Sequence, residues 1–308
     1  MEITRRLPFV QLDVFSSDPL AGNQLAVFPD ARGLETAQMQ AIAREMNFSE
    51  TTFILPREPE IERQHGTRVR IFTVHEELPF AGHPTLGTAT VLRGISGASL
   101  VWLDLDAGRI PVRFQAGPEA LPAAAALPPL GVAAWGEMRQ RDPEFGARHE
   151  PAAIAALAGL AVEDLAPDLP IQTVSTGLPF TIVPVRSLEA MGRLRVDFAR
   201  AAAYAAHRDA KFFYFVSRET SDASARLHAR MQFYGGEDPA TGSAAGCCAA
   251  WMVAHGVAQP NEQVLIEQGI EIRRPSRLFV RAGKVEGRIT EVHVGGYCVE
   301  VARGELFF

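Results

Sequence analysis

Two glycine-containing segments of this chain have the composition of helix starts that can bind an anion. They are Gly82-His83-Pro84-Thr85 and Thr241-Gly242-Ser243. The first turn of a helix leaves backbone N–H groups unpaired and carries partial positive charge, and glycine lets a ligand approach the backbone closely. Two such ends facing one cleft would bind a carboxylate. Taken singly, each segment is better explained as an ordinary helix start, because proline, threonine and serine favour that position.

Three titratable residues could act on a bound carboxylate. His83 stands between a glycine and a proline, which gives its side chain a prescribed direction. Asp238 precedes Pro239 and lies five residues before Ser243, although Asp-Pro alone is only a turn signal. Glu50 lies between an expected helix and an apolar strand, and its local sequence alone favours a solvated turn residue. The residues therefore indicate an anion site with acids and bases nearby, without specifying a reaction.

Each helix start belongs to the same local pattern, in which a strand and a glycine-containing loop lead into a helix of small and apolar residues. The two copies, residues 79–94 and 237–256, are about 160 positions apart. A helix with no polar face must be enclosed by other structure. We therefore expect an α+β fold of two similar lobes, each with short strands around a buried helix, and a cleft between the lobes. The first of these helices is expected to end at Gly94.

Other elements are predicted from hydrophobic periodicity and turn residues. Strands are expected at 7–15, 25–28, 51–55, 68–73, 172–177, 179–185 and 211–217, and a hairpin at 99–117. Helices are expected at about 35–46, at about 151–160 and between Ser187 and His207. The proline- and alanine-rich segment 118–134 is the candidate boundary between lobes. We expect one lobe to comprise 1–118 with about 295–308, and the other 119–294.

The composition is that of an ordinary globular protein. Of 308 residues, 47% are hydrophobic and 21% charged, and the formal charge is −6. This balance gives no sign of a basic surface for nucleic acid or anionic lipid. The N-terminus lacks the features of a signal peptide, and no apolar stretch approaches the roughly 18 residues of a membrane span. We expect a cytoplasmic protein with no nucleic-acid or membrane partner.

The three cysteines do not predict a disulfide framework or a zinc site. Two of them, Cys247 and Cys248, are adjacent, and their spacing fits neither arrangement. Small buried apolar residues in a reducing compartment explain them best.

Several motifs in order along the chain resemble one known family. They are DVF…PLAGNQLAVF near the N-terminus, NFSETTF at 47–53, ELPFAGHPTLGTA at 77–89, GxxDPATGSAAG at 235–246 and QGIEIRRPS at 268–276. Together they are similar to the phenazine-biosynthesis PhzF-like family of the diaminopimelate-epimerase superfamily. The resemblance extends over almost the whole chain, so it is far more specific than any single motif.

The resemblance implies a fold and a set of roles. The fold would be the diaminopimelate-epimerase-like one, with two pseudo-symmetric lobes, each a sheet curled around a central helix, and the site between them. Glu50 would be the essential base, and His83 and Asp238 would assist proton movement. Gly82, Gly242, Ser243 and Asn23 would bind the substrate, with Ser243 and the glycine amides holding its carboxylate. No metal or cofactor is implied, and a homodimer is left open.

The residues at two further positions narrow the chemistry. The racemases and epimerases of the superfamily use two cysteines directly before a glycine, and the corresponding residues here are Ala81 and Thr241. A two-cysteine racemase is therefore disfavoured, and carboxylate chemistry remains. The resemblance implies a cofactor-independent isomerase that moves a carbon-bound proton on a small carboxylate-bearing substrate, with trans-2,3-dihydro-3-hydroxyanthranilate as the named candidate. An isomerase or epimerase of another small amino or hydroxy acid is an alternative, as is a non-catalytic binder of small carboxylates.

Overall fold

The computed structural model describes residues 5–118, 133–233 and 235–308. The chain divides into two compact units, Met1–Arg139 with Gly295–Phe308, and Gln140–Val294. The boundary therefore follows residue 139, whereas the sequence placed it after residue 118. The proline- and alanine-rich segment 118–134 was expected to be that boundary. Its residues 119–132 lie outside the part of the chain that the structure describes.

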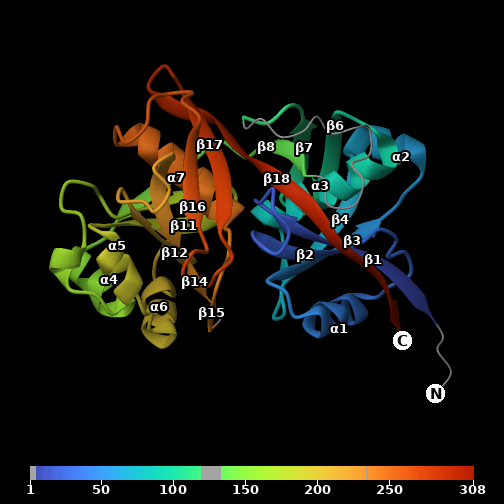
Figure 1. Cartoon of the computed structure of the whole chain (residues 1–308), viewed down its shortest axis with the longest axis horizontal. Helices are drawn as coiled ribbons and strands as arrows, with labels where there is room; N and C mark the ends of the chain where they lie inside the picture. Colours follow the sequence, from blue (N-terminus) through green and yellow to red (C-terminus); the bar gives the residue numbers. More distant parts are fainter. Residues whose placement is uncertain (1–4, 119–132, 234) are drawn as a thin grey trace. The chain divides into compact units, whose positions relative to one another are not determined.

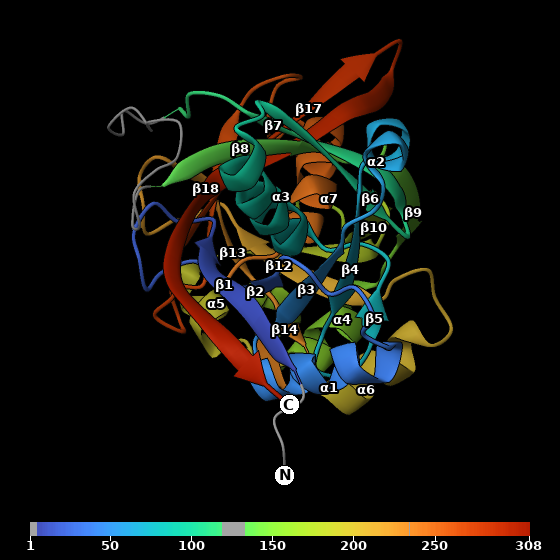
Figure 2. The same ribbon diagram turned by 90° about the vertical axis from the view of Figure 1, so that its right-hand side faces the viewer.

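Strands form most of the first unit. They are β1 (Arg6–Val14), β2 (Asn23–Phe28), β3 (Glu50–Leu55), β4 (Thr67–Phe72), β5 (Glu77–Leu78), β6 (Leu100–Leu105), β7 (Gly108–Phe114), β8 (Ala134–Arg139) and the last part of β18 (Arg288–Phe307). Its helices are α1 (Thr36–Met46), α2 (Pro59–His65) and α3 (Gly82–Ser96). The strands pair in the order β1-β2-β3-β4-β6-β7-β8-β18, and β18 pairs again with β1. The described strands of this unit thus close into a barrel, and Figure 2 shows α3 among them.

The central helix α3 packs closely against the barrel because it carries a glycine, Gly87, at the contact. A Cβ on Gly87 would lie 2.5 Å from Leu25 Cδ2 and 2.9 Å from Val14 Cγ2, so the strands come nearer than any larger residue permits. Residues 82–89 are buried, whereas the last turn of the helix is exposed. The predicted end at Gly94 is wrong, because the helix continues to Ser96 and Gly97 provides the left-handed cap at φ 70°.

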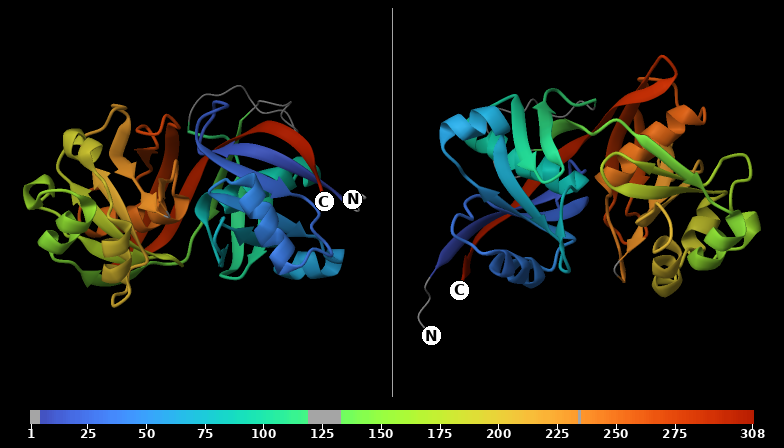
Figure 3. Two further views of the ribbon diagram at one scale, coloured as in Figure 1. Left: turned by 90° about the horizontal axis from the view of Figure 1, so that it is seen from below. Right: turned by 180° about the vertical axis from the view of Figure 1, so that it is seen from behind.

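The second unit repeats the plan. Its strands are β9 (Glu144–Arg148), β10 (Gln172–Ser175), β11 (Pro179–Val185), β12 (Phe212–Ser217), β13 (Ala225–Arg230), β14 (Gln232–Phe233), β15 (Gly236–Glu237), β16 (Val264–Gln268), β17 (Ser276–Val285) and the first part of β18. Its helices are α4 (Pro151–Ala158), the short η1 (Val162–Asp164), α5 (Leu188–Arg193), α6 (Phe198–Ala205) and α7 (Gly242–Ala254). The sheet runs β9-β10-β11-β12-β13-β16-β17-β18. Figure 3 shows α7, in orange, beside the red β17–β18 hairpin.

Strand pairing reveals that the two units are copies of one topology. In the first unit β1–β2 is antiparallel, β2–β3 parallel, β3–β4 antiparallel, β4–β6 parallel and β6–β7 antiparallel. In the second, β10–β11, β11–β12, β12–β13, β13–β16 and β16–β17 follow the same alternation. The crossover between the second parallel pair is α3 in one unit and α7 in the other (Figure 1). The predicted α+β fold with a strand-enclosed helix in each half is confirmed.

Further helices cover the outer faces of the strands. In the first unit, Met39 and Ile42 of α1 pack on Phe28 and Phe53 of the barrel strands. In the second, α4, α5 and α6 contribute to a buried cluster with strands β11 and β12. Strands covered on both faces need continuous apolar sequence, which explains runs such as residues 179–185.

No helix in the described part of the chain is long and apolar enough to span a membrane. Within the described ranges, no group of three or more His, Cys, Asp or Glu side chains could hold a metal ion.

Candidate active site

In the first unit, the ends of three elements bring together the predicted residues Asn23, Glu50 and His83. Asn23 is the first residue of β2 and Glu50 the first residue of β3. Because these two strands are parallel neighbours, with Leu25 paired to Glu50, both residues lie at the same edge of the barrel. His83 is the second residue of α3, the helix that begins at this edge.

The imidazole of His83 lies between the other two side chains. Its Nδ1 is 3.1 Å from the Asn23 Nδ2 and its Nε2 is 3.5 Å from the Glu50 Oε2. All three residues are buried, with exposed fractions of 1% for Asn23, 3% for His83 and 7% for Glu50. If the Asn23 amide donates to Nδ1, the ring carries its proton on Nε2, directed at the Glu50 carboxylate.

Burial determines the charge state of His83. Desolvation lowers its pKa to about 3, against a smaller opposing effect of a hydrogen bond with the Gln24 backbone. The ring is therefore neutral at pH 7. Its Nε2 is buried and has no hydrogen-bond partner among the described residues. Buried polar atoms are nearly always satisfied, so a ring nitrogen without a partner beside a carboxylate is typical of a place where a ligand binds.

Hydrogen bonds between buried hydroxyl groups and between backbone groups hold the elements of this site together. The Thr88 hydroxyl donates to Thr52 Oγ1 at 2.8 Å, which ties α3 to the strand that begins with Glu50. Ala81 has extended backbone, and the Thr85 N–H donates to its carbonyl at 3.3 Å. The Gly82 amide therefore lies in the first turn, before the helical hydrogen-bond ladder begins.

In the second unit, the predicted residues Asp238 and Ser243 lie in and beside the loop before α7. The Thr241 hydroxyl donates to Asp238 Oδ2 at 2.7 Å, and the Asp238 N–H donates to the Met231 carbonyl at 2.9 Å. Asp238, Thr241 and Ser243 are all buried. The Ala245 N–H is bonded to the Thr241 carbonyl, so the amides of Gly242 and Ser243 precede the helical ladder.

Hydrogen bonds from residues outside the helix also hold the start of α7. The Gln140 Nε2 donates to the Gly242 carbonyl at 2.9 Å, and the Thr176 hydroxyl donates to Gln140 Oε1 at 2.6 Å. A Cβ on Gly246 would lie 1.9 Å from that same oxygen, so only glycine admits the Gln140 amide here.

Each loop that leads into a central helix is closed by a bidentate arginine–glutamate pair. In the first unit, Arg70 donates to both carboxylate oxygens of Glu77 at 2.6 Å. In the second, Arg230 donates to both oxygens of Glu237 at 2.8 and 2.6 Å. The arginines, the glutamates and the glycines that begin α3 and α7 are each 160 positions apart. This duplicated pair was not predicted, although the shared offset was visible in the sequence.

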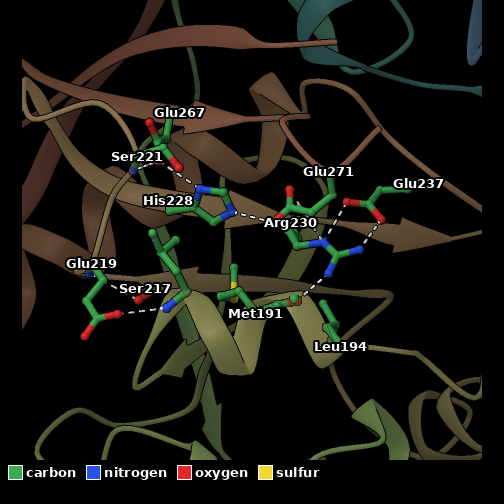
Figure 4. A network of polar contacts seen from close by, with 12 residues as sticks. Met191, Leu194, Ser217, Glu219, Ser221, His228, Arg230, Glu237, Glu267 and Glu271 are labelled. Carbon is green, nitrogen blue, oxygen red and sulfur yellow. Dashed lines mark hydrogen bonds and ion pairs between the residues drawn. The ribbon is translucent and has the colours of Figure 1, made fainter. Parts of the chain in front are cut away.

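The second of these pairs belongs to a larger buried network, shown in Figure 4. His228 Nδ1 lies 2.8 Å from Glu267 Oε1, and its Nε2 lies 2.9 Å from Glu271 Oε1. Glu271 also lies 3.8 Å from Arg230. Burial alone would lower the pKa of His228, but the hydrogen bonds and charges of Glu271 and Glu267 outweigh burial and raise it. Acidic and basic side chains thus alternate along the network, from Glu267 of β16 to Glu237, the residue before Asp238.

The cysteines take no part in acid–base chemistry at neutral pH. All three are free and buried. Burial raises the pKa of the Cys247 thiol to about 11, and it raises those of Cys248 and Cys298 as well. These thiols stay protonated, in keeping with the interpretation of Cys247 as a buried helix residue.

The duplicated, helix-centred units define a protein of the diaminopimelate-epimerase-like fold, as the resemblance implied. The family model for phenazine biosynthesis-like proteins matches residues 12–304. The chain therefore belongs to the phenazine-biosynthesis PhzF-like family, and it is an isomerase.

Similar proteins include two isomerases and one solved structure. An uncharacterized isomerase of Mesorhizobium japonicum is 38% identical, over 97% of this chain and 98% of the relative. The trans-2,3-dihydro-3-hydroxyanthranilate isomerase of Pseudomonas chlororaphis is 36% identical, again over 97% and 98%. The crystal structure of a PhzF-family phenazine biosynthesis protein from Bacillus anthracis superposes with a TM-score of 0.84 at 26% identity, covering 99% of this chain and 100% of that one.

Proposed function

We propose that this isomerase moves a proton between carbon atoms of a small carboxylate-bearing substrate, with Glu50 as the base. The observation that carries the proposal is the buried Glu50 carboxylate 3.5 Å from the buried Nε2 of His83. A neutral imidazole N–H beside the carboxylate can hold a polar group of the substrate while the carboxylate accepts the proton. Such general acid–base transfer is worth on the order of a hundredfold to ten-thousandfold in rate.

The remaining predicted residues supply binding and a second acid–base group in this proposal. The backbone amides at Gly82 and Gly242, with the Ser243 hydroxyl, bind the substrate carboxylate, since the first turn of a helix favours an anion. Those donors also disperse the negative charge that develops when the carbon-bound proton leaves. Asp238 returns or relays the proton. Asn23 orients His83 and contributes to substrate binding.

The first candidate substrate is trans-2,3-dihydro-3-hydroxyanthranilate, for which the Pseudomonas chlororaphis relative is named. Its carboxylate would occupy the helix-start donors, and the proton moved would be one on its ring. Another small amino or hydroxy acid with a carboxylate beside an acidic C–H would use the same groups, and this is the second candidate. The two candidates share the role of Glu50 and differ only in the substrate.

The test compares Glu50→Gln with wild type for turnover and for solvent deuterium entering a carbon position of the substrate. We expect deuterium in wild-type product, and a loss of at least about a hundredfold in the variant because the amide cannot accept the proton. Glu45→Gln is the matched control, since Glu45 is exposed on α1 of the same unit. Wild-type turnover by Glu50→Gln would refute the proposed base.

The same experiment decides between catalysis and mere binding. A non-catalytic carboxylate binder would keep its ligand affinity in Glu50→Gln and would show no deuterium exchange in wild type. Exchange that depends on Glu50 would exclude the binder.

We also propose a cytoplasmic location. Three buried cysteines without a disulfide suit a reducing compartment. A homodimer stays a prediction of the family resemblance, and sedimentation velocity would test it.

A further inference from the structure

One fully buried amide, that of Gln268, lies against the loop that contains Asp238. Gln268 is the last residue of β16 and has an exposed fraction of 0%. Its Nε2 donates to the Asp238 carbonyl at 2.8 Å and to Thr241 Oγ1 at 2.9 Å. Its Oε1 accepts from the Thr241 N–H at 3.2 Å and from the Tyr214 hydroxyl at 3.0 Å. Both amide protons and both oxygen lone pairs are therefore used.

These contacts determine the direction of every hydrogen bond between Gln268 and Asp238. The Thr241 N–H is a donor, so the Gln268 oxygen must face it and the NH2 group must face the Thr241 hydroxyl. That hydroxyl accepts from Gln268, so its own proton points to Asp238 Oδ2, 2.7 Å away. Oδ2 is consequently held as an acceptor, and the bond to the Thr241 hydroxyl fixes the orientation of the Asp238 carboxylate.

The far end of this chain of bonds is equally fixed. Tyr214 is buried within β12. Burial raises the pKa of its phenol well above the usual value, so the hydroxyl keeps its proton at neutral pH and donates it to Gln268. No member of the chain is free to reverse its hydrogen bond.

The backbone is built to bring Gln268 to this loop. Gly269 follows with a φ of 80°, and a Cβ there would lie 2.6 Å from the Pro239 carbonyl oxygen and 2.3 Å from the Arg274 carbonyl oxygen. Only glycine permits this approach of β16 to the Asp238–Pro239 turn. The motif QGIEIRRPS therefore contains both Gln268, whose amide makes these hydrogen bonds, and Gly269, which allows the close approach.

We propose that Gln268 is a positioning residue, which acts through Thr241 to hold the Asp238 carboxylate in the orientation that proton transfer requires. The inference rests on the proposed role of Asp238 in proton transfer. It also assigns a purpose to Thr241, the residue at the position of a superfamily cysteine. Here the side chain polarises a neighbouring carboxylate, and it is not itself the base.

The kinetic test uses Gln268→Met and Thr241→Val, which keep the side-chain size but remove the directed hydrogen bonds. We expect kcat to fall by about tenfold to a hundredfold in each, with KM changed much less, because a misplaced catalytic group costs up to about that factor. Thr241→Ser restores the hydroxyl and is expected to recover most of the rate. Tyr214→Phe is the control, since Gln268 Oε1 keeps the Thr241 N–H and the direction of the chain is preserved.

Melting temperatures separate positioning from a structural role. If Gln268→Met and Thr241→Val lose stability but the folded enzymes retain wild-type kcat, the inference is overturned while Glu50→Gln still tests the base.

A titration without substrate tests the positioning of Asp238 even if the proposed function is wrong. The 13C signal of the Asp238 carboxyl, assigned by its loss in Asp238→Asn, is followed against pH in wild type and in Thr241→Val. Because the hydroxyl stabilises the ionised form, its loss should move the midpoint to higher pH by about one unit. An unchanged midpoint would overturn the inference.

Discussion

The Nε2 atom of His83 lies 3.5 Å from Oε2 of Glu50, and both side chains are buried in the same unit. This separation exceeds an ordinary N–H···O hydrogen bond, so the two groups face each other without being locked together. Asn23 holds the opposite side of the imidazole at 3.1 Å. The arrangement places a neutral imidazole and a carboxylate side by side.

The charge state of His83 should be visible as a pH dependence of stability. Its pKa of about 3 in the folded protein is below the value of 6.5 for an exposed histidine. As pH falls from 6.5 towards 3 the unfolded chain takes up a proton that the folded protein does not, so stability is lost by at most about 1.4 kcal/mol per pH unit. Urea unfolding of wild type and His83→Asn between pH 7 and 4.5 should show the difference narrowing at acid pH. An NMR midpoint for His83 near 6.5 would contradict the expectation.

His228 should behave in the opposite sense. Its pKa is raised, because the hydrogen bonds and charges of Glu271 and Glu267 outweigh the effect of burial. The protonated ring therefore contributes stability that is complete below pH 6.5 and is lost as pH rises through the folded pKa. We expect the stability difference between wild type and His228→Gln to shrink between pH 6 and 9.

The two arginine–glutamate pairs should differ in energy because they differ in burial. The side chains of Arg230 and Glu237 have exposed fractions of 4% and 9%, whereas those of Arg70 and Glu77 have 18% and 25%. Removing Arg230 leaves buried carboxylates without their partner, so Arg230→Met should cost about 3–5 kcal/mol. For Arg70→Met we expect about 1 kcal/mol.

Chemical denaturation of both variants measures these costs. Arg63→Met breaks an exposed pair with Glu60 and should have little effect. Equal losses for Arg70→Met and Arg230→Met would show that burial does not govern the pairs.

Gly246 should not tolerate a side chain, although it lies inside a helix where alanine is normally favoured. An added Cβ would meet the Gln140 oxygen at 1.9 Å and displace an amide bonded to Gly242 and Thr176. We expect Gly246→Ala to cost about 1–3 kcal/mol in unfolding free energy. Gly192→Ala is the matched control, because Gly192 is also helical and a Cβ there meets nothing within 4 Å. The control should be neutral or stabilising by up to about 1 kcal/mol, and a similar result for Gly246→Ala would contradict the close contact.

The burial of the two central helices could be predicted from their composition. Neither α3 nor α7 has a polar face, and burial of residues 82–89 and 242–253 follows. The β6–β7 hairpin was likewise predicted and is confirmed, since alternation of apolar and polar residues marks it locally. The end of α3 was placed too early at Gly94, because a glycine inside a helix and a glycine that caps one have the same sequence signal.

Residues that act through long-range contacts could not be found in this way. Gln268 is a buried amide, and nothing in its neighbours along the chain indicates partners 27 and 54 positions away. Arg70 and Glu77 are only seven positions apart, but they meet because β4 and β5 pair, and strand periodicity alone does not indicate that pairing. The strongly charged helix α2 was missed because it contains no buried residue, and so no apolar stripe marks it.

The duplicated strand order has a consequence for how this enzyme could change over time. Each copy carries its own arginine–glutamate pair and its own central helix, so one loop can change without a matching change in the other. Positions 160 apart have indeed diverged, with His83 opposite Ser243 and Leu78 opposite Asp238. A scaffold with a repeated strand order thus carries different side chains at equivalent positions of its two copies.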